Sequence, residues 1–100
     1  MPDKHSYELT KLADDDLENI AFYGMQPFGL DQARQYHEGL IRQFERAAES
    51  PLQFPVVDGF GTKYRRCVYQ KHSIYYTIEE AGVLIVRILS RQDVRASLEH

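Results

Sequence analysis

The apolar residues between Asp31 and Ser50 recur at intervals of three and four, the spacing of a helix with one buried face. The repeating residues are Ala33, Tyr36, His37, Leu40, Ile41, Phe44, Ala47 and Ala48. Asp31 stands where its side chain can cap the first turn. The segment therefore predicts a long amphipathic helix that needs another layer to cover its apolar face.

A less regular helix is predicted after Thr10, an N-cap candidate, and runs to about Gln26. Three aspartates at positions 14–16 crowd its early turns, where the helix dipole favours anions. Its apolar stripe consists of Ala13, Leu17, Ile20, Ala21 and Gly24. Because Pro27 and Gly29 end this helix and the link to the next one is short, the two helices are expected to form an antiparallel hairpin.

From Lys63 onward, β-branched and aromatic residues dominate and are interrupted twice by polar turns. They predict three strands at about 63–70, 72–78 and 83–90, and His5 to Leu9 predicts a short first strand. The order is β-α-α-β-β-β, an α+β fold whose helical hairpin covers one face of a small, mainly antiparallel sheet. Residues 1–97 are expected to form one domain, and residues 98–100 resemble the start of a vector-encoded histidine tag.

The predicted sheet is apolar on both faces. Strict alternation in the last strand points Leu84, Val86 and Ile88 one way and Val83, Ile85 and Leu89 the other. In the strand before it, Tyr75 alternates with Ile74 and Tyr76. Two explanations remain open: the last strand is central and its second face is partly covered within the monomer, or that face docks another chain.

Several apolar residues of the first helix and its link lie outside the core stripe, and this favours docking. They are Leu12, Phe22, Met25 and Phe28. On a lone monomer these side chains would be exposed, and a helix of a partner would cover them.

Charge is unevenly distributed along the chain. Residues 1–62 hold five basic and eleven acidic residues, whereas residues 63–97 hold seven basic and three acidic residues. The overall net charge of −3 argues against a protein that grips nucleic acid over its whole surface. An anionic partner is therefore expected only at the second half.

The residue pattern predicts no metal or cofactor. The four histidines (His5, His37, His72 and His100) have no paired spacing, and Cys67 is the only cysteine. No signal peptide or long apolar run is visible, which favours a protein of the cytoplasm without membrane contact.

A ribonuclease centre in the basic half is a further hypothesis. Arg65, Arg66, Arg87 and Arg91 are its candidate cations, and His72 or Tyr75 is its candidate proton-transfer group. Adjacent strand residues point to opposite faces, however, so at most one of Arg65 and Arg66 can line a given site.

A series of short motifs in unbroken order resembles the ParE branch of the RelE/ParE toxin superfamily over about residues 7–97. The matching residues are Ala13, Asp16, Leu17, Ile20, Tyr23, Gly29, Ala33, Pro51, Arg65-Arg66, Ile74, Tyr76, Arg87-Ile88-Leu89 and Arg91-Gln92-Asp93. The resemblance implies the same β-α-α-β-β-β fold and the toxin of a type II toxin-antitoxin system, a class linked to plasmid stabilisation. It also implies a ParD-like antitoxin as partner, DNA gyrase as target, no catalytic residue, and no sequence-specific nucleic-acid binding except through the antitoxin.

On this resemblance, antitoxin-binding residues are expected at Leu12, Phe22, Met25, Phe28, Tyr75 and Ile85, and target-binding residues at Arg65, Arg87 and Arg91. RelE-like relatives, which are ribosome-dependent mRNA endoribonucleases, are the alternative. They place an arginine where this chain has Ser73, and they tend to carry a tyrosine or histidine near the C-terminus. The chain also departs from the usual ParE pattern, because Ser90 replaces a histidine.

Overall fold

The computed structural model describes residues 6–21, 29–57 and 63–90. Its elements are β1 (Tyr7–Leu9), α1 (Lys11–Asn19), α2 (Leu30–Glu49), the short 3-10 helix η3 (Pro51–Gln53), β2 (Arg65–Tyr69), β3 (His72–Glu79) and β4 (Gly82–Ser90). The predicted β-α-α-β-β-β order is therefore confirmed. No helix in these three ranges is long and apolar enough to cross a membrane.

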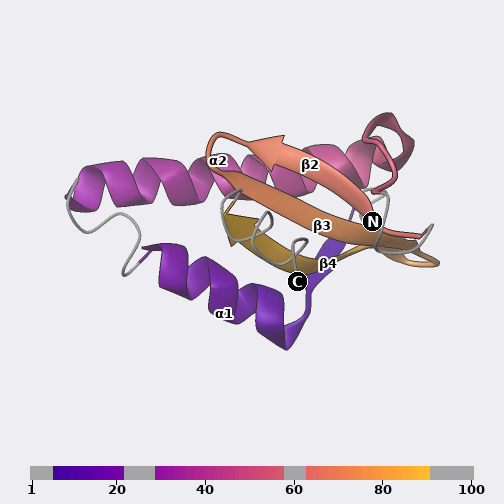
Figure 1. The fold of residues 1–100 in the computed structure, drawn as a ribbon, viewed down its shortest axis with the longest axis horizontal. Coiled ribbons are helices and arrows are strands. Elements are labelled where there is room, and N and C mark those ends of the chain that lie inside the picture. Colours follow the sequence, from indigo (N-terminus) through magenta and orange to yellow (C-terminus); the bar gives the residue numbers. More distant parts are fainter. Residues whose placement is uncertain (1–5, 22–28, 58–62, 91–100) are drawn as a thin grey trace.

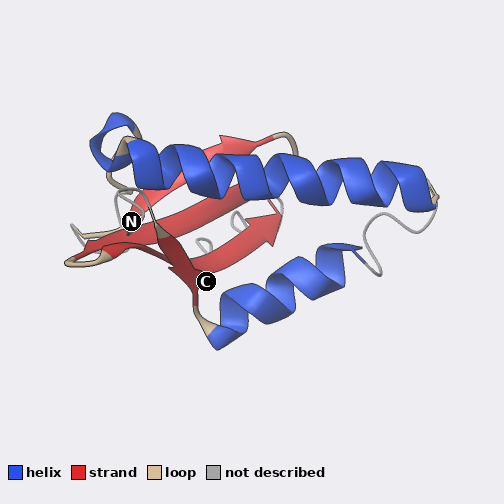
Figure 2. Cartoon of the chain, turned by 180° about the vertical axis from the view of Figure 1, so that it is seen from behind, coloured by secondary structure: helices blue, strands red, loops and turns tan. Residues whose placement is uncertain are grey.

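The four strands form one sheet in the order β1-β4-β3-β2. β1 runs parallel to β4, and the other neighbours are antiparallel. β4 is thus a central strand, as one of the two explanations for its apolar faces requires. Helix α2 lies across one face of the sheet and α1 lies beside β4 (Figures 1 and 2).

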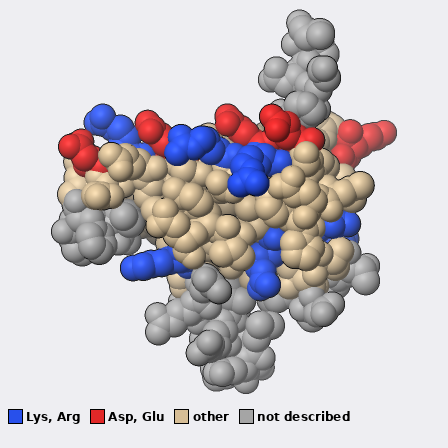
Figure 3. Space-filling view, turned by 90° about the horizontal axis from the view of Figure 1, so that it is seen from above, with Lys and Arg blue, Asp and Glu red and all other residues tan. Residues whose placement is uncertain are grey.

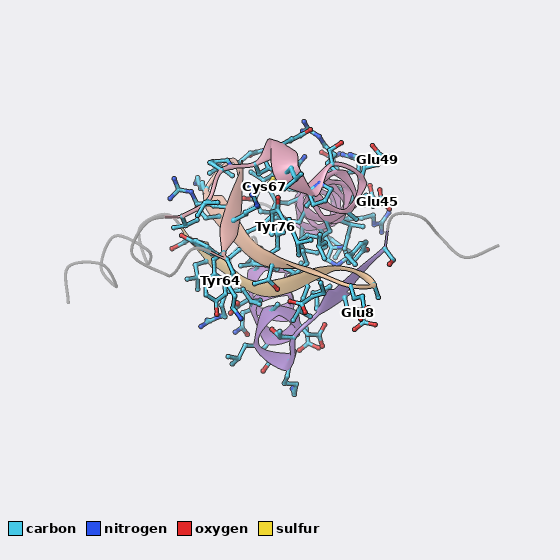
Figure 4. The ribbon with its side chains drawn as sticks, turned by 90° about the vertical axis from the view of Figure 1, so that its right-hand side faces the viewer. Glu8, Glu45, Glu49, Tyr64, Cys67 and Tyr76 are labelled. Atoms are coloured by element: carbon cyan, nitrogen blue, oxygen red, sulfur yellow. The ribbon has the colours of Figure 1, made fainter. Side chains whose placement is uncertain are left out.

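The main core lies between α2 and the sheet. The buried side chains of largest volume are those of Tyr76, Phe44, Leu40, Ile74, Ile85 and Cys67. The cluster also includes Ala13 and Leu17 of α1 and Ile20, the residue that follows this helix, as the predicted stripe requires. Figure 4 shows Tyr76 and Cys67 inside, whereas Glu45 and Glu49 project from α2 into solvent. Burying each large apolar side chain contributes about 1.5–3 kcal/mol, so this layer supplies most of the driving force for folding.

A β-bulge changes which residues of β4 share a face. The register shifts between Tyr75 and Tyr76, so that Tyr75 pairs with Arg87 whereas Tyr76 pairs with Ile85. The extra residue, Val86, reverses the alternation beyond it. Val83, Ile85 and Ile88 consequently all belong to the main core. Strict alternation placed Ile85 on the second face and Ile88 on the same face as Leu84 and Val86. Both predictions were wrong, because strict alternation does not allow for an inserted residue.

β1 pairs only with the first part of β4, so the edge of β4 beyond Ile85 needs other partners. Helix α1 and its cap supply them. Thr10 donates its backbone N–H to the carbonyl of Ile85 (3.0 Å) and its hydroxyl to that of Val86 (2.9 Å). The same hydroxyl accepts from the N–H of Ala13 (3.1 Å), which confirms the predicted N-cap.

Asp16 also forms hydrogen bonds with this edge of β4. One carboxylate oxygen accepts from the backbone N–H of Ile88 (2.9 Å) and from Nε of Arg87 (2.8 Å), and the other accepts from Nη2 of Arg87 (3.0 Å). This bidentate hydrogen bond raises the pKa of Arg87. Asp16 therefore does more than favour the start of the helix, because it also bonds to β4.

We predict that Asp16→Asn lowers the free energy of unfolding by about 2 kcal/mol, because the Arg87 guanidinium loses its charged partner. The loss stays below that of a fully buried pair, since the Arg87 side chain is 40% exposed. Asp14→Asn, at an exposed position of the same helix, is the matched control and should change stability by less than about 0.5 kcal/mol. Urea denaturation measures both, and equal effects would contradict the bridging role of Asp16.

We also predict a fall in stability at alkaline pH that depends on Tyr76. Burial raises the pKa of Tyr76 from 10.0 to about 12, and its hydroxyl donates to the carbonyl of Pro51 (2.6 Å). The unfolded chain releases this proton at lower pH than the folded protein, so the free energy of unfolding falls as the pH rises from 10 towards 12. Tyr76→Phe should make this fall shallower in urea titrations at successive pH values, and an unchanged slope would exclude Tyr76 as its source.

Candidate interaction surfaces

The residues predicted to bind an antitoxin lie in different environments. Leu12 is 57% exposed on the outer side of α1. Tyr75 is 4% exposed and lies on the face of the sheet opposite α2, here called the far face. Ile85 is fully buried in the main core and is not available on either surface. Phe22, Met25 and Phe28 lie outside the described residues.

The far face carries a small apolar cluster. Tyr75 packs there with Val57, and Val86 and Leu89 lie against the pair. Arg66 is the register partner of Tyr75 on β2, so its side chain lies on this face too. The second apolar face predicted from the sequence therefore exists, although its members differ from those expected.

Two of the three predicted target-binding cations serve the fold. Arg65 lies opposite the core residue Tyr76, on the α2 side, and its Nη1 donates to the carbonyl of Phe54 (2.7 Å). Arg87 is held by Asp16. Arg91 lies outside the described residues.

Arg66 was not among the residues predicted to bind the target, although it lies on the far face beside Tyr75. The β2–β3 register confirms that Arg65 and Arg66 point to opposite faces. Within the described ranges, the side chain of Arg66 forms no hydrogen bond or ion pair. Strand alternation is the signal that separates the two arginines, and it does not indicate by itself which face a helix covers.

His72, a candidate proton-transfer group, is part of a packed cluster. The Tyr36 hydroxyl lies 2.7 Å from Nδ1 of His72 and 3.3 Å from the carbonyl oxygen of Tyr69. The Tyr36 ring also packs against those of Tyr69 and His72. The end of the Tyr69 side chain occupies the space that a Cβ at Gly39 would fill, so Gly39 permits this hairpin to approach α2 closely. The cluster anchors the β2–β3 hairpin to α2.

The thiol of the only cysteine is equally enclosed. Cys67 is buried, its Sγ lies 3.5 Å from Oε1 of Gln43, and burial raises the pKa of the thiol. A raised pKa disfavours the thiolate, the reactive form. Among the described residues, no three His, Cys, Asp or Glu side chains are grouped so as to hold a metal ion.

Comparisons with known proteins agree on one family. The family described as "ParE toxin of type II toxin-antitoxin system, parDE" matches residues 7–95. Toxin ParE1 of Caulobacter vibrioides is 32% identical over 93 residues, which cover 92% of this chain and 96% of that protein. Toxin ParE1 of Mycobacterium tuberculosis is also 32% identical, over 94 residues and with the same coverage of each chain.

A solved structure titled "Chromosomal ParDE TA system from P. aeruginosa" has the same fold. Its chain aligns with a TM-score of 0.74 over 87% of this chain and 96% of its own length, at 17% sequence identity.

Proposed function

The chain belongs to the ParE toxin family of type II toxin-antitoxin systems, and we propose that this toxin acts by binding DNA gyrase, without cutting a substrate. The target follows from the family resemblance, because gyrase is the usual target of ParE toxins. Gyrase acts on DNA inside the cell, so the proposed site of action is the cytoplasm.

Binding is favoured over catalysis because the groups that could react are held in structural contacts. RNA cleavage needs a base, an acid and cations that converge on one phosphate. Here Arg65 lies on the α2 side, Arg87 is tied to Asp16, and His72 is packed against Tyr36. These groups serve separate structural contacts in the described part of the chain.

The position that distinguishes the RelE-like nucleases supports the same conclusion. Those relatives carry an arginine where this chain has Ser73, and Ser73 is 2% exposed between its neighbours in the sheet. A small buried hydroxyl cannot supply the positive charge that an arginine would offer a phosphate. Endoribonuclease activity remains the alternative that the first experiment below tests.

A ParD-like antitoxin is the proposed partner that neutralises the toxin. Leu12 supports this proposal, since a large apolar side chain on the outer side of α1 gains stability when a partner helix covers it. Phe22, Met25 and Phe28 are proposed to extend the same contact, and Tyr75 to contribute from the far face. Arg66 replaces Arg65 and Arg87 as the proposed target contact, together with Arg91.

Expression of the toxin without its antitoxin tests the target. We expect filamentous cells and induction of the DNA-damage response, because gyrase held on DNA leaves breaks. Inhibition of supercoiling by purified gyrase is the direct measurement. Rapid arrest of translation with cleaved mRNA would instead support the endoribonuclease, and undisturbed growth would contradict both activities.

Leu12→Glu tests the antitoxin contact. A charge at this exposed position should leave the fold intact and weaken antitoxin binding by about tenfold or more in calorimetry, because the carboxylate loses water in the complex. Asn19→Glu adds the same charge at another exposed position of α1 and is the matched control. Equal affinity for the two variants would remove Leu12 from the interface.

A further inference from the structure

Positive charge is concentrated on the β2–β3 hairpin, although the chain as a whole is acidic. From Lys63 to Ile78 the chain carries four basic residues and no acidic one, whereas its net charge is −3. Figure 3 shows a separation of charge on the surface: the acidic side chains gather along one margin of the molecule, while the opposite margin shows Lys and Arg alone. An anionic partner is therefore expected at the hairpin.

Three of the four cations are available to such a partner. Arg65 is engaged, because its Nη1 donates to the carbonyl of Phe54 (2.7 Å). Lys63 and Lys71 are exposed, and Arg66 lies on the far face. Neither ion pair of the described residues includes one of these three side chains. Lys63, Arg66 and Lys71 are here called the basic row.

The spacing of the basic row indicates which kind of anion it fits. Extended backbone rises about 3.3 Å per residue, so Arg66 and Lys71, five positions apart, are separated by roughly 15 Å. Lys63 precedes Arg66 by about 10 Å on the same measure. A row of this length suits an extended polyanion better than a single phosphate group. Duplex DNA presents a phosphate about every 3.4 Å along each strand, so each cation can meet a different phosphate.

We propose that the basic row contacts the phosphate backbone of the DNA duplex that gyrase holds, so that the toxin binds gyrase and DNA together. The inference rests on the gyrase target proposed above and names the chemistry of one of its contacts. Phosphate contacts carry no sequence information, so DNA of any sequence is expected to serve.

Three phosphate contacts are too few for the toxin to hold DNA by itself. Affinity for DNA rises with the number of phosphates that a protein neutralises, and each contact contributes about 0.9 to the slope of log affinity against log salt concentration. The net negative charge of the rest of the chain opposes such binding. The basic row therefore adds to a protein contact, and DNA should increase the affinity of the toxin for gyrase.

Binding of fluorescently labelled toxin to purified gyrase, with and without a linear DNA duplex, tests this contact. We expect binding at least about fivefold tighter with DNA at low salt, because the row gains its phosphates. The slope of log affinity against log potassium chloride concentration should be more negative by about 2.7 when DNA is present. Equal affinities and equal slopes in the two conditions would overturn the inference.

The double substitution of Lys63→Gln and Lys71→Gln removes two contacts at exposed positions, where the fold should tolerate it. The slope with DNA should become less negative by about 1.8, and most of the gain from DNA should be lost. Arg34→Gln with Arg42→Gln removes the same charge from exposed positions of α2 and is the matched control, which should keep the wild-type slope. Equal effects of the two double variants would contradict a local contact at the hairpin.

The same variants separate DNA from an acidic surface of gyrase itself. If the lysine variant binds gyrase more weakly by the same factor with and without DNA, the basic row contacts the gyrase protein and the DNA contact is rejected. A change in the shape of gyrase on binding DNA would strengthen the binding of every variant alike. A loss confined to the lysine variant in the presence of DNA therefore supports a direct contact.

Failure of this inference is distinguishable from failure of the proposed target. If the wild-type toxin does not bind gyrase in either condition, the target proposal fails and the DNA contact fails with it. If the toxin binds gyrase and inhibits supercoiling while DNA changes neither affinity nor slope, the target stands and only the DNA contact is rejected.

Discussion

The carboxylate of Asp16 holds the arrangement of the first helix against the sheet. β1 leaves most of one edge of β4 without a strand partner, and a helix cannot offer backbone groups sideways to a strand. Asp16 bridges this gap by accepting from the Ile88 amide and from the Arg87 guanidinium. Together with the hydrogen bonds from Thr10 to Ile85 and Val86, this carboxylate holds α1 against β4 and fixes the direction of the Arg87 side chain.

Much of the fold could be predicted because its local and global patterns agree. The helical period of residues 31–50, the Thr10 cap and the alternation of β3 each indicated the structure that formed. The residues on each face of β4 could not be predicted, because a β-bulge depends on how two strands pair and cannot be recognised in the sequence of one strand alone. Ile85 was misplaced for this reason. The role of Asp16 was missed because its two partners are more than 70 residues away in the sequence.

For the candidate surfaces too, local features could be predicted from the sequence, whereas features that depend on distant contacts could not. Sequence reasoning identified Leu12 because it lies outside a helical period, which is a local property. It did not separate Arg65 from Arg66 by function, since the difference depends on which face α2 covers. His72, a candidate acid-base group of the nuclease hypothesis, is packed against Tyr36. Among the described residues, the chain therefore offers a partner surface contacts: the exposed Leu12 side chain and the far-face cation Arg66.

The parallel pairing of β1 with β4 also has a consequence for synthesis on the ribosome. Tyr7 pairs with Val83, so the first strand waits for a partner made more than 70 residues later. β4 also pairs with β3 and contributes three residues to the main core. A nascent chain that ends before Gly82 lacks the strand on which the sheet closes, and incomplete chains cannot adopt the toxin fold.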